Sequence, residues 1–295
     1  MARSTLRRLL VVGLAPTLLL AAGAVALAGT GNGSKALLDP VVPPKTSPQF
    51  ASPCKFSHRA SDDPIVFPRK AGRSHSHDFI GNTGTNAFST YAKLRAGGTS
   101  CKRDEDTAAY WVPTLYHEGK ALQPIRSNIY YLPGGKDPAS IKAFPTKLKI
   151  IAGDAKAKGP QDLKVLAWHC GAGSQPNNAP PVCGAGDADT LIMRIRFPDC
   201  WDGRNRDSKD HKGHMAYASP KRRGEQFKTC PDSHPVPVPE LALNVRYPTP
   251  GGGEIKLASG AHFTGHADFL NAWDQGELER LVARCLNGQQ HCGAN

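Results

Sequence analysis

The sequence predicts a mainly β protein, a single-domain β-sandwich or jelly-roll-like fold with long disulfide-bonded loops and a C-terminal helix. Three observations lead to this fold class. Thirty glycines and 25 prolines interrupt the 295-residue chain too often for long helices. Several short segments alternate apolar and polar residues, and eight cysteines are spread between them.

The alternating segments supply the predicted strands. Residues 191–197 place four apolar side chains on one face and two arginines on the other, and residues 241–247 alternate in the same way. Residues 108–116 and 121–132 are rich in aromatic and β-branched side chains, and the short turn sequence at 117–120 predicts a hairpin between them. Residues 148–152 and 165–170 predict two further strands.

A single helix is predicted near the C-terminus. Asp274 is suited to cap it, with Glu277 three residues later as in a capping box, and Gly288 is suited to end it. Its apolar side chains share one face: Leu278, Leu281, Val282 and Cys285.

The N-terminus predicts export. Residues 1–28 combine a basic start, a long apolar run and the small-residue site Ala26-Leu27-Ala28, which is typical of a secretory signal peptide. The alternative is an uncleaved membrane anchor, because the apolar run is long enough to span a bilayer, and only then would a membrane be a partner. Residues 29–50 read as a flexible linker and residues 51–295 as one secreted domain.

Export decides how the cysteines are interpreted. An even number of cysteines without a C-x-x-C pair favours four disulfides in an oxidising compartment. We expect pairing in chain order, because two of the pairs would close short loops. The cysteines are Cys54, Cys101, Cys170, Cys183, Cys200, Cys230, Cys285 and Cys292.

The chain is basic, with a formal net charge of +12, or +9 without the three arginines of the signal. Such a charge favours anionic extracellular partners such as acidic polysaccharides, although solubility alone is an alternative explanation. The basic residues are scattered and no nucleic-acid-binding motif accompanies them, so nucleic acid is not an expected partner.

Histidines and carboxylates gather in three distant segments, and we interpret them as one catalytic site. His75 and His77 lie two apart, as do His266 and Asp268, so each pair would point to one side of an extended strand. The full candidate catalytic set is His75, His77, Asp78, Asp202, Asp210, His211, His214, His266 and Asp268. The alternative for such residues is local hydrogen bonding to the backbone.

Three kinds of chemistry remain open for this set. A divalent metal ion such as Zn²⁺ could be held by His75, His77, His211, His214 and His266. Without a metal, two carboxylates could act as acid and base in glycoside hydrolysis. A lyase could instead remove the proton next to a uronate carboxylate.

Aromatic residues near these segments are candidates for stacking on sugar rings, although core packing is the more common role of tryptophan. With Asn82, the candidate substrate-binding residues are Tyr110, Trp111, Trp201 and Trp273. The sequence lacks the G-x-S-x-G, P-loop, H-E-x-x-H and dinucleotide-binding motifs. With every cysteine expected in a disulfide, a cysteine nucleophile is not expected either.

The order of the motifs resembles a known family. The run H-S-H-D-F-I-G-N at 75–82 is followed by Y-W-V-P-T-L-Y at 110–116, C-W-D-G at 200–203, D-S-K-D-H-K-G-H at 207–214 and H-A-D-F at 266–269. Together they resemble the secreted family of unknown function numbered nineteen-ninety-six, over roughly residues 54–286. Ser76 departs from the bulkier residue of several relatives, but it should face away from the site.

The resemblance implies a carbohydrate setting, because fungal members often stand beside WSC modules, which are associated with carbohydrate binding. We therefore expect a secreted hydrolase or lyase that acts on an extracellular or cell-wall polysaccharide. The alternatives are a metal-binding protein with a histidine-rich site and a non-enzymatic wall-binding module.

Overall fold

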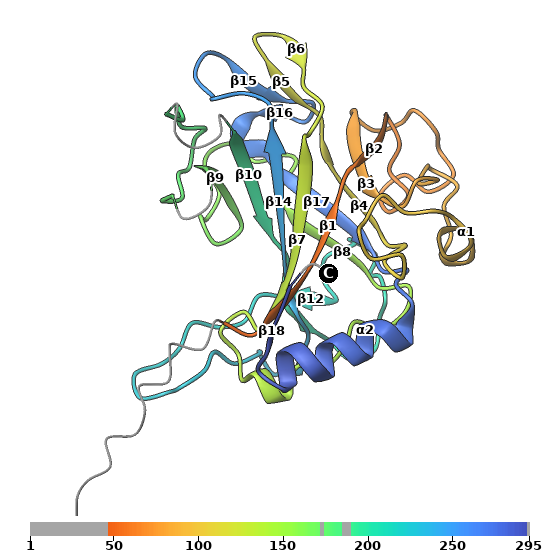
Figure 1. Ribbon diagram of the computed structural model, residues 1–295, viewed down its shortest axis with the longest axis vertical. Helices are drawn as coiled ribbons and strands as arrows, with labels where there is room; N and C mark the ends of the chain where they lie inside the picture. Colours follow the sequence, from red (N-terminus) through yellow and green to blue (C-terminus); the bar gives the residue numbers. More distant parts are fainter. Residues whose placement is uncertain (1–46, 172–173, 185–189, 294–295) are drawn as a thin grey trace, which may run out of the picture. The chain divides into compact units, whose positions relative to one another are not determined.

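Two β-sheets pack face to face around the main hydrophobic core in the computed structural model of the chain. The structure describes residues 47–171, 174–184 and 190–293. The predicted signal peptide and residues 29–46 of the predicted linker lie outside these ranges. In Figure 1, β17 and β8 of one sheet cross behind β7 and β1 of the other. The mainly β sandwich predicted from the sequence is confirmed.

The first sheet has six strands in the order β18, β1, β7, β14, β10, β9. Their bounds are β18 (His291–Cys292), β1 (Gln49–Cys54), β7 (Arg126–Leu132), β14 (Glu240–Tyr247), β10 (Leu191–Arg196) and β9 (Leu166–Cys170). Neighbouring strands are antiparallel except β18 and β1.

The second sheet has five antiparallel strands in the order β2, β3, β4, β17, β8. Their bounds are β2 (Phe56–Ala60), β3 (His77–Gly81), β4 (Ala109–Pro113), β17 (His266–Leu270) and β8 (Lys149–Gly153).

Smaller elements surround the sandwich. Two short sheets contain β11 (Cys200–Trp201), β12 (Met215–Ala216) and β13 (Val236–Pro237), and β5 (Leu115–His117), β6 (Lys120–Ala121), β15 (Ile255–Leu257) and β16 (Gly260–Ala261). The helical segments are α1 (Tyr91–Ala96), η1 (Pro138–Ser140), η2 (His262–Thr264), α2 (Gln275–Leu281) and η3 (Val282–Asn287). In the described ranges no helix combines the length and apolar content needed to cross a membrane.

The alternation predicted for the strands is confirmed in β10. Met193 and Ile195 are fully buried in the core between the sheets, whereas Arg194 and Arg196 keep partial contact with solvent. A strand with one face on a core and one toward solvent has this pattern, because successive side chains point to opposite faces.

The predicted hairpin is only partly right. β5 and β6 do pair around the turn at Glu118 and Gly119, both of which have positive φ. However, β4 and β7 belong to different sheets. A proline has no N–H to donate to a sheet ladder, and Pro113 and Pro124 stand at the two points where the chain leaves one sheet for the next.

The C-terminal helix follows its prediction. The side chain of Asp274 accepts a hydrogen bond from the Glu277 backbone N–H at 3.1 Å, and Gly288 follows the last turn of η3. The four apolar side chains predicted to share a face are all buried: Leu278, Leu281, Val282 and Cys285.

All four disulfides join cysteines in chain order, as predicted: Cys54–Cys101, Cys170–Cys183, Cys200–Cys230 and Cys285–Cys292. Disulfides of this number are typical of extracellular proteins. The first strand starts earlier than predicted, since β1 begins at Gln49 inside the expected linker. Phe50 is fully buried and stacks on Tyr131 at 4.5 Å between ring centroids, which fixes this end of the strand.

A polar network crosses the core between the sheets. Asp106 accepts hydrogen bonds from the hydroxyls of Ser52 at 2.6 Å and Tyr110 at 3.0 Å. The Tyr110 and Tyr131 hydroxyls are 2.7 Å apart, and Trp273 Nε1 donates to Tyr131 at 2.8 Å. Complete burial raises the pKa of Asp106 to about 7.

Candidate metal centre

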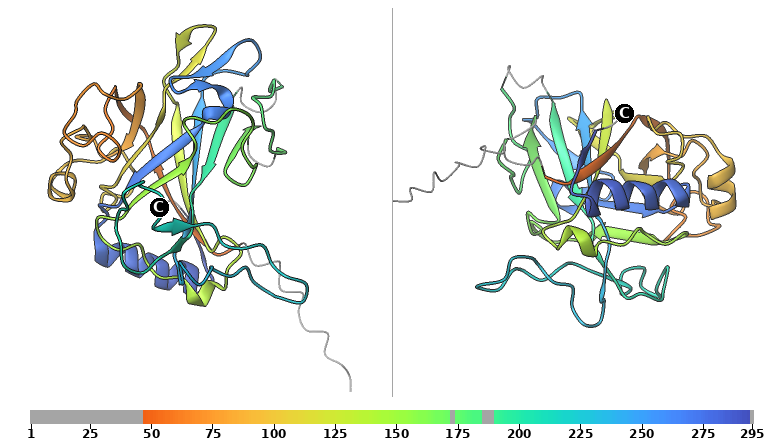
Figure 2. Two further views of the ribbon diagram at one scale, coloured as in Figure 1. Left: turned by 180° about the vertical axis from the view of Figure 1, so that it is seen from behind. Right: turned by 60° about the horizontal axis from the view of Figure 1, so that its bottom comes forward.

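The outer face of the five-stranded sheet carries the predicted histidines. In β3 and β17 every second residue points to this face, which places His77, His266 and Asp268 on it. Ala267 and Phe269 of β17 belong to the core on the opposite face. Figure 2 shows this side of the molecule from behind, where the blue strand β17 and the green strand β8 run across the front.

Three imidazoles converge at one point. His266 Nε2 lies 3.1 Å from His75 Nε2 and 3.4 Å from His77 Nε2. The rings of His75 and His77 are 4.3 Å apart between centroids. His77 and His266 are buried, with exposed fractions of 0% and 4%, whereas His75 is only half-buried and leaves the cluster open on its side.

Backbone carbonyls fix how two of the rings carry their protons. His77 Nδ1 lies 2.9 Å from the carbonyl oxygen of Asp62, and His266 Nδ1 lies 2.9 Å from that of Thr264. A carbonyl oxygen can only accept, so each Nδ1 must donate its N–H. In the neutral ring Nε2 is then unprotonated and directs its lone pair at the centre of the cluster.

Burial keeps these rings neutral. Desolvation is the largest effect on each of them: it lowers the pKa of His266 to about 4 and that of His77 well below 6.5. Neighbouring imidazoles lower both values further. Two or more lone pairs therefore face each other at close range, an arrangement that a bound cation would stabilise.

The spacing matches tetrahedral coordination. Ligand nitrogens at 2.0–2.1 Å from a zinc ion are about 3.3 Å apart in a tetrahedron. The two Nε2 separations given above, 3.1 and 3.4 Å, bracket this value. The three residues could thus hold one metal ion without a large movement.

Two buried carboxyl groups adjoin the histidines. One oxygen of Asp63, one of Asp268 and one nitrogen of His77 lie within 4.8 Å of one another. Asp63 uses Oδ1 to accept the backbone N–H groups of Ile65 and Val66. Asp268 Oδ2 is buried and has no hydrogen-bond partner among the described residues.

An unpartnered buried carboxyl group is costly and calls for a functional explanation. Burial, and then the charge of Asp63, raises the pKa of Asp268 well above its ordinary value. In the metal-free protein burial therefore favours the protonated form of Asp268. Beside a metal ion it could ionise and become a fourth ligand.

The other predicted catalytic residues have hydrogen-bond or ion-pair partners outside this cluster. Asp78 follows His77 but points to the other face of β3, where it forms an ion pair with Arg59 at 2.6 Å. His214 lies between Ser208 Oγ and the carbonyl oxygen of Lys149, and His211 pairs with Asp207 at 2.7 Å.

Asp202 and Asp210 stabilise turns. Asp202 Oδ1 accepts the backbone N–H groups of Arg204 and Asn205, and Asp210 Oδ1 accepts those of Lys212 and Gly213. Such local hydrogen bonds to the backbone are the alternative role that the sequence left open for these residues. Of the five predicted metal ligands the structure brings together His75, His77 and His266, but not His211 or His214.

The predicted substrate-binding aromatics are mostly enclosed. Tyr110, Trp111 and Trp273 have no exposed surface, so their ring faces pack in the protein and cannot meet a sugar. Asn82 is also buried and donates to the carbonyl oxygens of Leu94 and Thr107. Trp201 remains half-buried, with its Nε1 donating to Asn205.

Sequence reasoning missed Asp63. It lies in an irregular stretch before Pro64, where no periodicity predicts its direction. The signal that could have found it is the acidic pair Asp62-Asp63 a dozen residues before the histidines. A second triad, Cys54, Cys101 and Asp106, also has ligand-like spacing, but its two cysteines are joined in a disulfide and offer no thiolate.

Comparison with known proteins gives one match. Residues 63–273 match the family described as Domain of unknown function (DUF1996). No curated protein and no solved structure matches the chain. The matched segment contains Asp63, all three histidines and Asp268, and it spans more than half of the chain. The chain therefore belongs to the DUF1996 family, as its motifs predicted.

Proposed function

We propose that the chain is a secreted metal-dependent enzyme that cleaves an extracellular polysaccharide at the centre formed by His75, His77 and His266. The observation that carries the proposal is the convergence of the three Nε2 atoms, 3.1 and 3.4 Å apart, with the Nδ1 atoms of His77 and His266 held by carbonyls. Zinc is the first candidate ion, because neutral imidazoles and a carboxylate suit it.

A catalytic role for the metal ion, rather than a purely structural one, is supported by the number of protein ligands at the site. Structural zinc sites commonly use four protein ligands, whereas catalytic ones keep a position for water or substrate. Here three nitrogens converge, and the half-exposed ring of His75 borders the solvent. A bound ion would supply an activated water or polarise an oxygen of the substrate.

Asp268 has the properties of the proton-transfer group. Its pKa is raised by burial, and it lies within reach of His77. Where Asp268 does not itself bind the ion, a carboxyl group with a raised pKa can give its proton to a leaving oxygen. The same residue could accept a proton in an elimination, so hydrolase and lyase remain alternatives for experiment.

Extracellular polysaccharide is proposed from the setting of the chain. The four disulfides and the predicted signal favour export, and the positive charge favours polymers that carry carboxylates.

The experiment combines elemental analysis with polymer cleavage. We expect about one zinc per chain and cleavage of an acidic polysaccharide that stops after chelation and returns when zinc is added. New reducing ends accompanied by unsaturated products would identify a lyase. New reducing ends without unsaturated products would identify a hydrolase. His266→Ala should lose both metal and cleavage.

The matched control is His234→Ala, which removes an exposed-loop imidazole bonded to Gly213. It should keep metal and activity. A His266→Ala protein that folds and still cleaves at the wild-type rate would contradict the enzymatic proposal. Absence of bound metal after dialysis against zinc would contradict the metal centre itself.

A further inference from the structure

The outer face of the six-stranded sheet is rich in arginine. Strand register places Arg126 of β7 opposite Arg246 of β14, and Arg194 and Arg196 of β10 opposite Asn244 and Ala242 of β14. We call Arg126, Arg194, Arg196 and Arg246 the arginine face. These residues come from three adjacent strands and point away from the core.

The arginine face has little compensating charge. Among the described residues only Arg196 of the four forms an ion pair, with Glu240 at 3.4 Å. Arg246 donates to the hydroxyl of Thr190 at 2.8 Å. Burial, and then the charge of Arg126, lowers the pKa of Arg246. Like charges held this close favour the arrival of an anion.

Several polar atoms on this face lack partners. Arg194 Nε, Arg196 Nε and Asn244 Oδ1 are buried and make no hydrogen bond within the described chain. Burying such atoms without a hydrogen bond costs free energy of folding. Here the atoms lie on the side of the sheet that faces away from the core. A ligand on this face would meet the exposed parts of the guanidinium groups, where carboxylates can accept hydrogen bonds, and not these buried atoms themselves.

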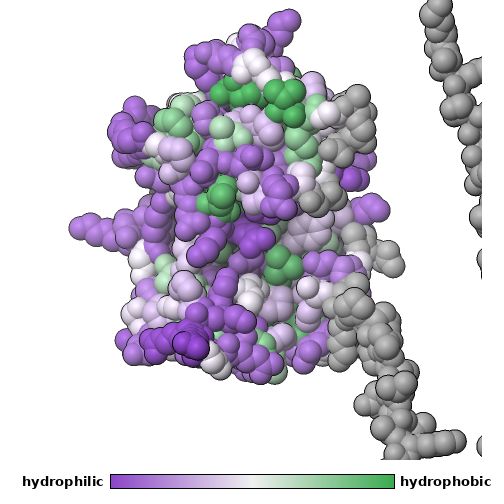
Figure 3. Space-filling model, turned by 90° about the vertical axis from the view of Figure 1, so that its left-hand side faces the viewer, coloured by the Kyte–Doolittle hydropathy of each residue, from purple (hydrophilic) through white to green (hydrophobic). Residues whose placement is uncertain are grey.

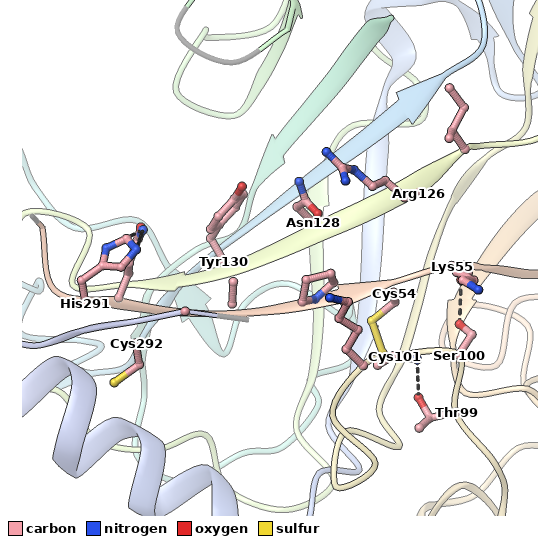
Figure 4. Close-up of a pocket in the computed structure, with 16 residues that line it drawn as sticks. Cys54, Lys55, Thr99, Ser100, Cys101, Arg126, Asn128, Tyr130, His291 and Cys292 are labelled. Carbon is pink, nitrogen blue, oxygen red and sulfur yellow. Dashed lines mark hydrogen bonds between the residues drawn. A yellow bond between two sulfur atoms is a disulfide. The ribbon is translucent and has the colours of Figure 1, made fainter. Parts of the chain in front are cut away.

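A groove continues the face toward β1. It has a volume of about 900 Å³ and lies over β18, β1 and β7. Figure 4 shows Tyr130, Asn128 and Arg126 following one another along β7, with Lys55 on the other side. Lys102 also lines it, and none of the described lining residues is acidic.

A second hollow, of about 530 Å³, adjoins the other end of β7. Leu132, Arg196 and Glu240 line it together with Lys136, Lys221 and Lys228. Basic side chains therefore line a hollow at each end of β7, and two of those in the second hollow are paired with acids, Lys136 with Asp199 and Arg196 with Glu240. The side of the molecule that Figure 3 shows is also mainly hydrophilic, with apolar residues in small separate groups.

We infer that the arginine face and the β1–β7 groove bind an extended polysaccharide that carries carboxylates. Guanidinium groups match carboxylates in two-pronged hydrogen bonds, and asparagine and tyrosine side chains suit sugar hydroxyls. Single-stranded nucleic acid fits less well, because the groove's described lining offers only two rings for stacking, those of Tyr130 and His291. The site is on the opposite outer face from the histidines, and binding does not require them.

The test measures affinity for polygalacturonate and for the same polymer with its carboxylates methyl-esterified. We expect binding of the first only, weakened about tenfold or more in the Arg126→Gln/Arg246→Gln variant. The matched control is Arg69→Gln/Arg73→Gln, which removes two exposed arginines from the loop before β3. It should change affinity by less than about twofold.

Thermal melts of each variant show whether the fold is kept, and Arg126→Lys/Arg246→Lys supplies a charge-conserving comparison that should bind with intermediate affinity. Polygalacturonate binding should be unchanged by chelation and by the His266→Ala substitution. A failure of the proposed metal centre can therefore be distinguished from a failure of this inference. Equal binding of the esterified polymer, equal loss in the control variant, or tighter binding of single-stranded DNA would overturn the inference.

Discussion

The two outer faces of the sandwich use the same strand alternation for opposite purposes. On the five-stranded sheet, loops cover the polar side chains, and His77, His266 and Asp268 are almost completely buried. On the six-stranded sheet, Arg126 is exposed and Arg194 and Arg246 are half-exposed. The difference shows that coverage by loops, rather than strand pattern, decides whether the polar side chains of a sheet face are buried in a site or exposed as surface charge.

Desolvation explains why the covered face suits a metal ion. Burial removes protons from imidazoles, so their lone pairs become ligands, whereas guanidinium groups keep their charge even when half-buried. The histidine face should thus bind a cation and the arginine face an anion. Four measurements test this contrast, in order of expected effect.

The largest effect is expected from His77→Ala. Because His77 belongs to both the histidine and the carboxyl cluster, we expect zinc affinity to fall at least about a thousandfold, on the order of 4 kcal/mol. Competition with a chromophoric chelator measures it. Polygalacturonate affinity should stay unchanged, and a parallel loss of both would remove the distinction between the faces.

The next effect is a pH dependence of metal-free stability. His266 has a pKa of about 4 in the folded protein and about 6.5 unfolded, so its contribution is present above pH 6.5 and lost as pH falls toward 4. The loss amounts to roughly 3 kcal/mol. Urea unfolding at several pH values, with His266→Gln as the comparison, measures it.

The contribution of Asp106 to stability changes with pH in the opposite direction and provides an internal control. Its folded pKa of about 7 lies above the unfolded value, so its contribution is present below pH 3.8 and lost as pH rises through 7. In Asp106→Asn that fall should disappear while the histidine effect remains. A His266→Gln protein with the wild-type pH profile would contradict the assignment of a neutral buried ring.

A smaller effect is expected from Asp268→Asn, which keeps the side-chain volume. We expect zinc affinity to fall about tenfold, since an amide is a weaker ligand than a carboxylate. Stability of the metal-free protein should hold or rise, because Asp268 Oδ2 has no partner within the described residues to lose. Chelator competition and urea unfolding check the two parts, and unchanged zinc affinity would exclude Asp268 from the centre.

The smallest effect concerns salt. Between low and physiological ionic strength, polygalacturonate affinity should fall several-fold, because half-exposed charges are screened. Zinc affinity should barely change over the same range, because the histidine ligands are neutral and buried. Isothermal titration at matched pH compares the two, and equal salt dependence would contradict the contrast.

The strands and half of the site could be predicted because they depend on local periodicity. His75, His77, His266 and Asp268 were grouped because residues two apart share a strand face. His211 was grouped with them but has a positive φ of 60° in an irregular loop, a conformation that no spacing rule reveals. Asp63 was missed for the same reason.

The arginine face shows a second limit of local patterns. The sequence predicted that Arg194 and Arg196 share the outer side of one strand. It could not predict that Arg246 and Arg126 would join them, because this depends on pairing between strands separated by more than 40 residues along the chain. Cross-strand register is set by the whole fold.

The most direct test of the central claim is a crystal structure of the zinc-loaded protein with anomalous scattering measured at the zinc edge. We expect one strong peak bonded to Nε2 of His75, His77 and His266 at about 2.0–2.1 Å, with a further position held by Asp268 or water. A peak elsewhere, or the three rings hydrogen-bonded to one another without an ion, would contradict the account.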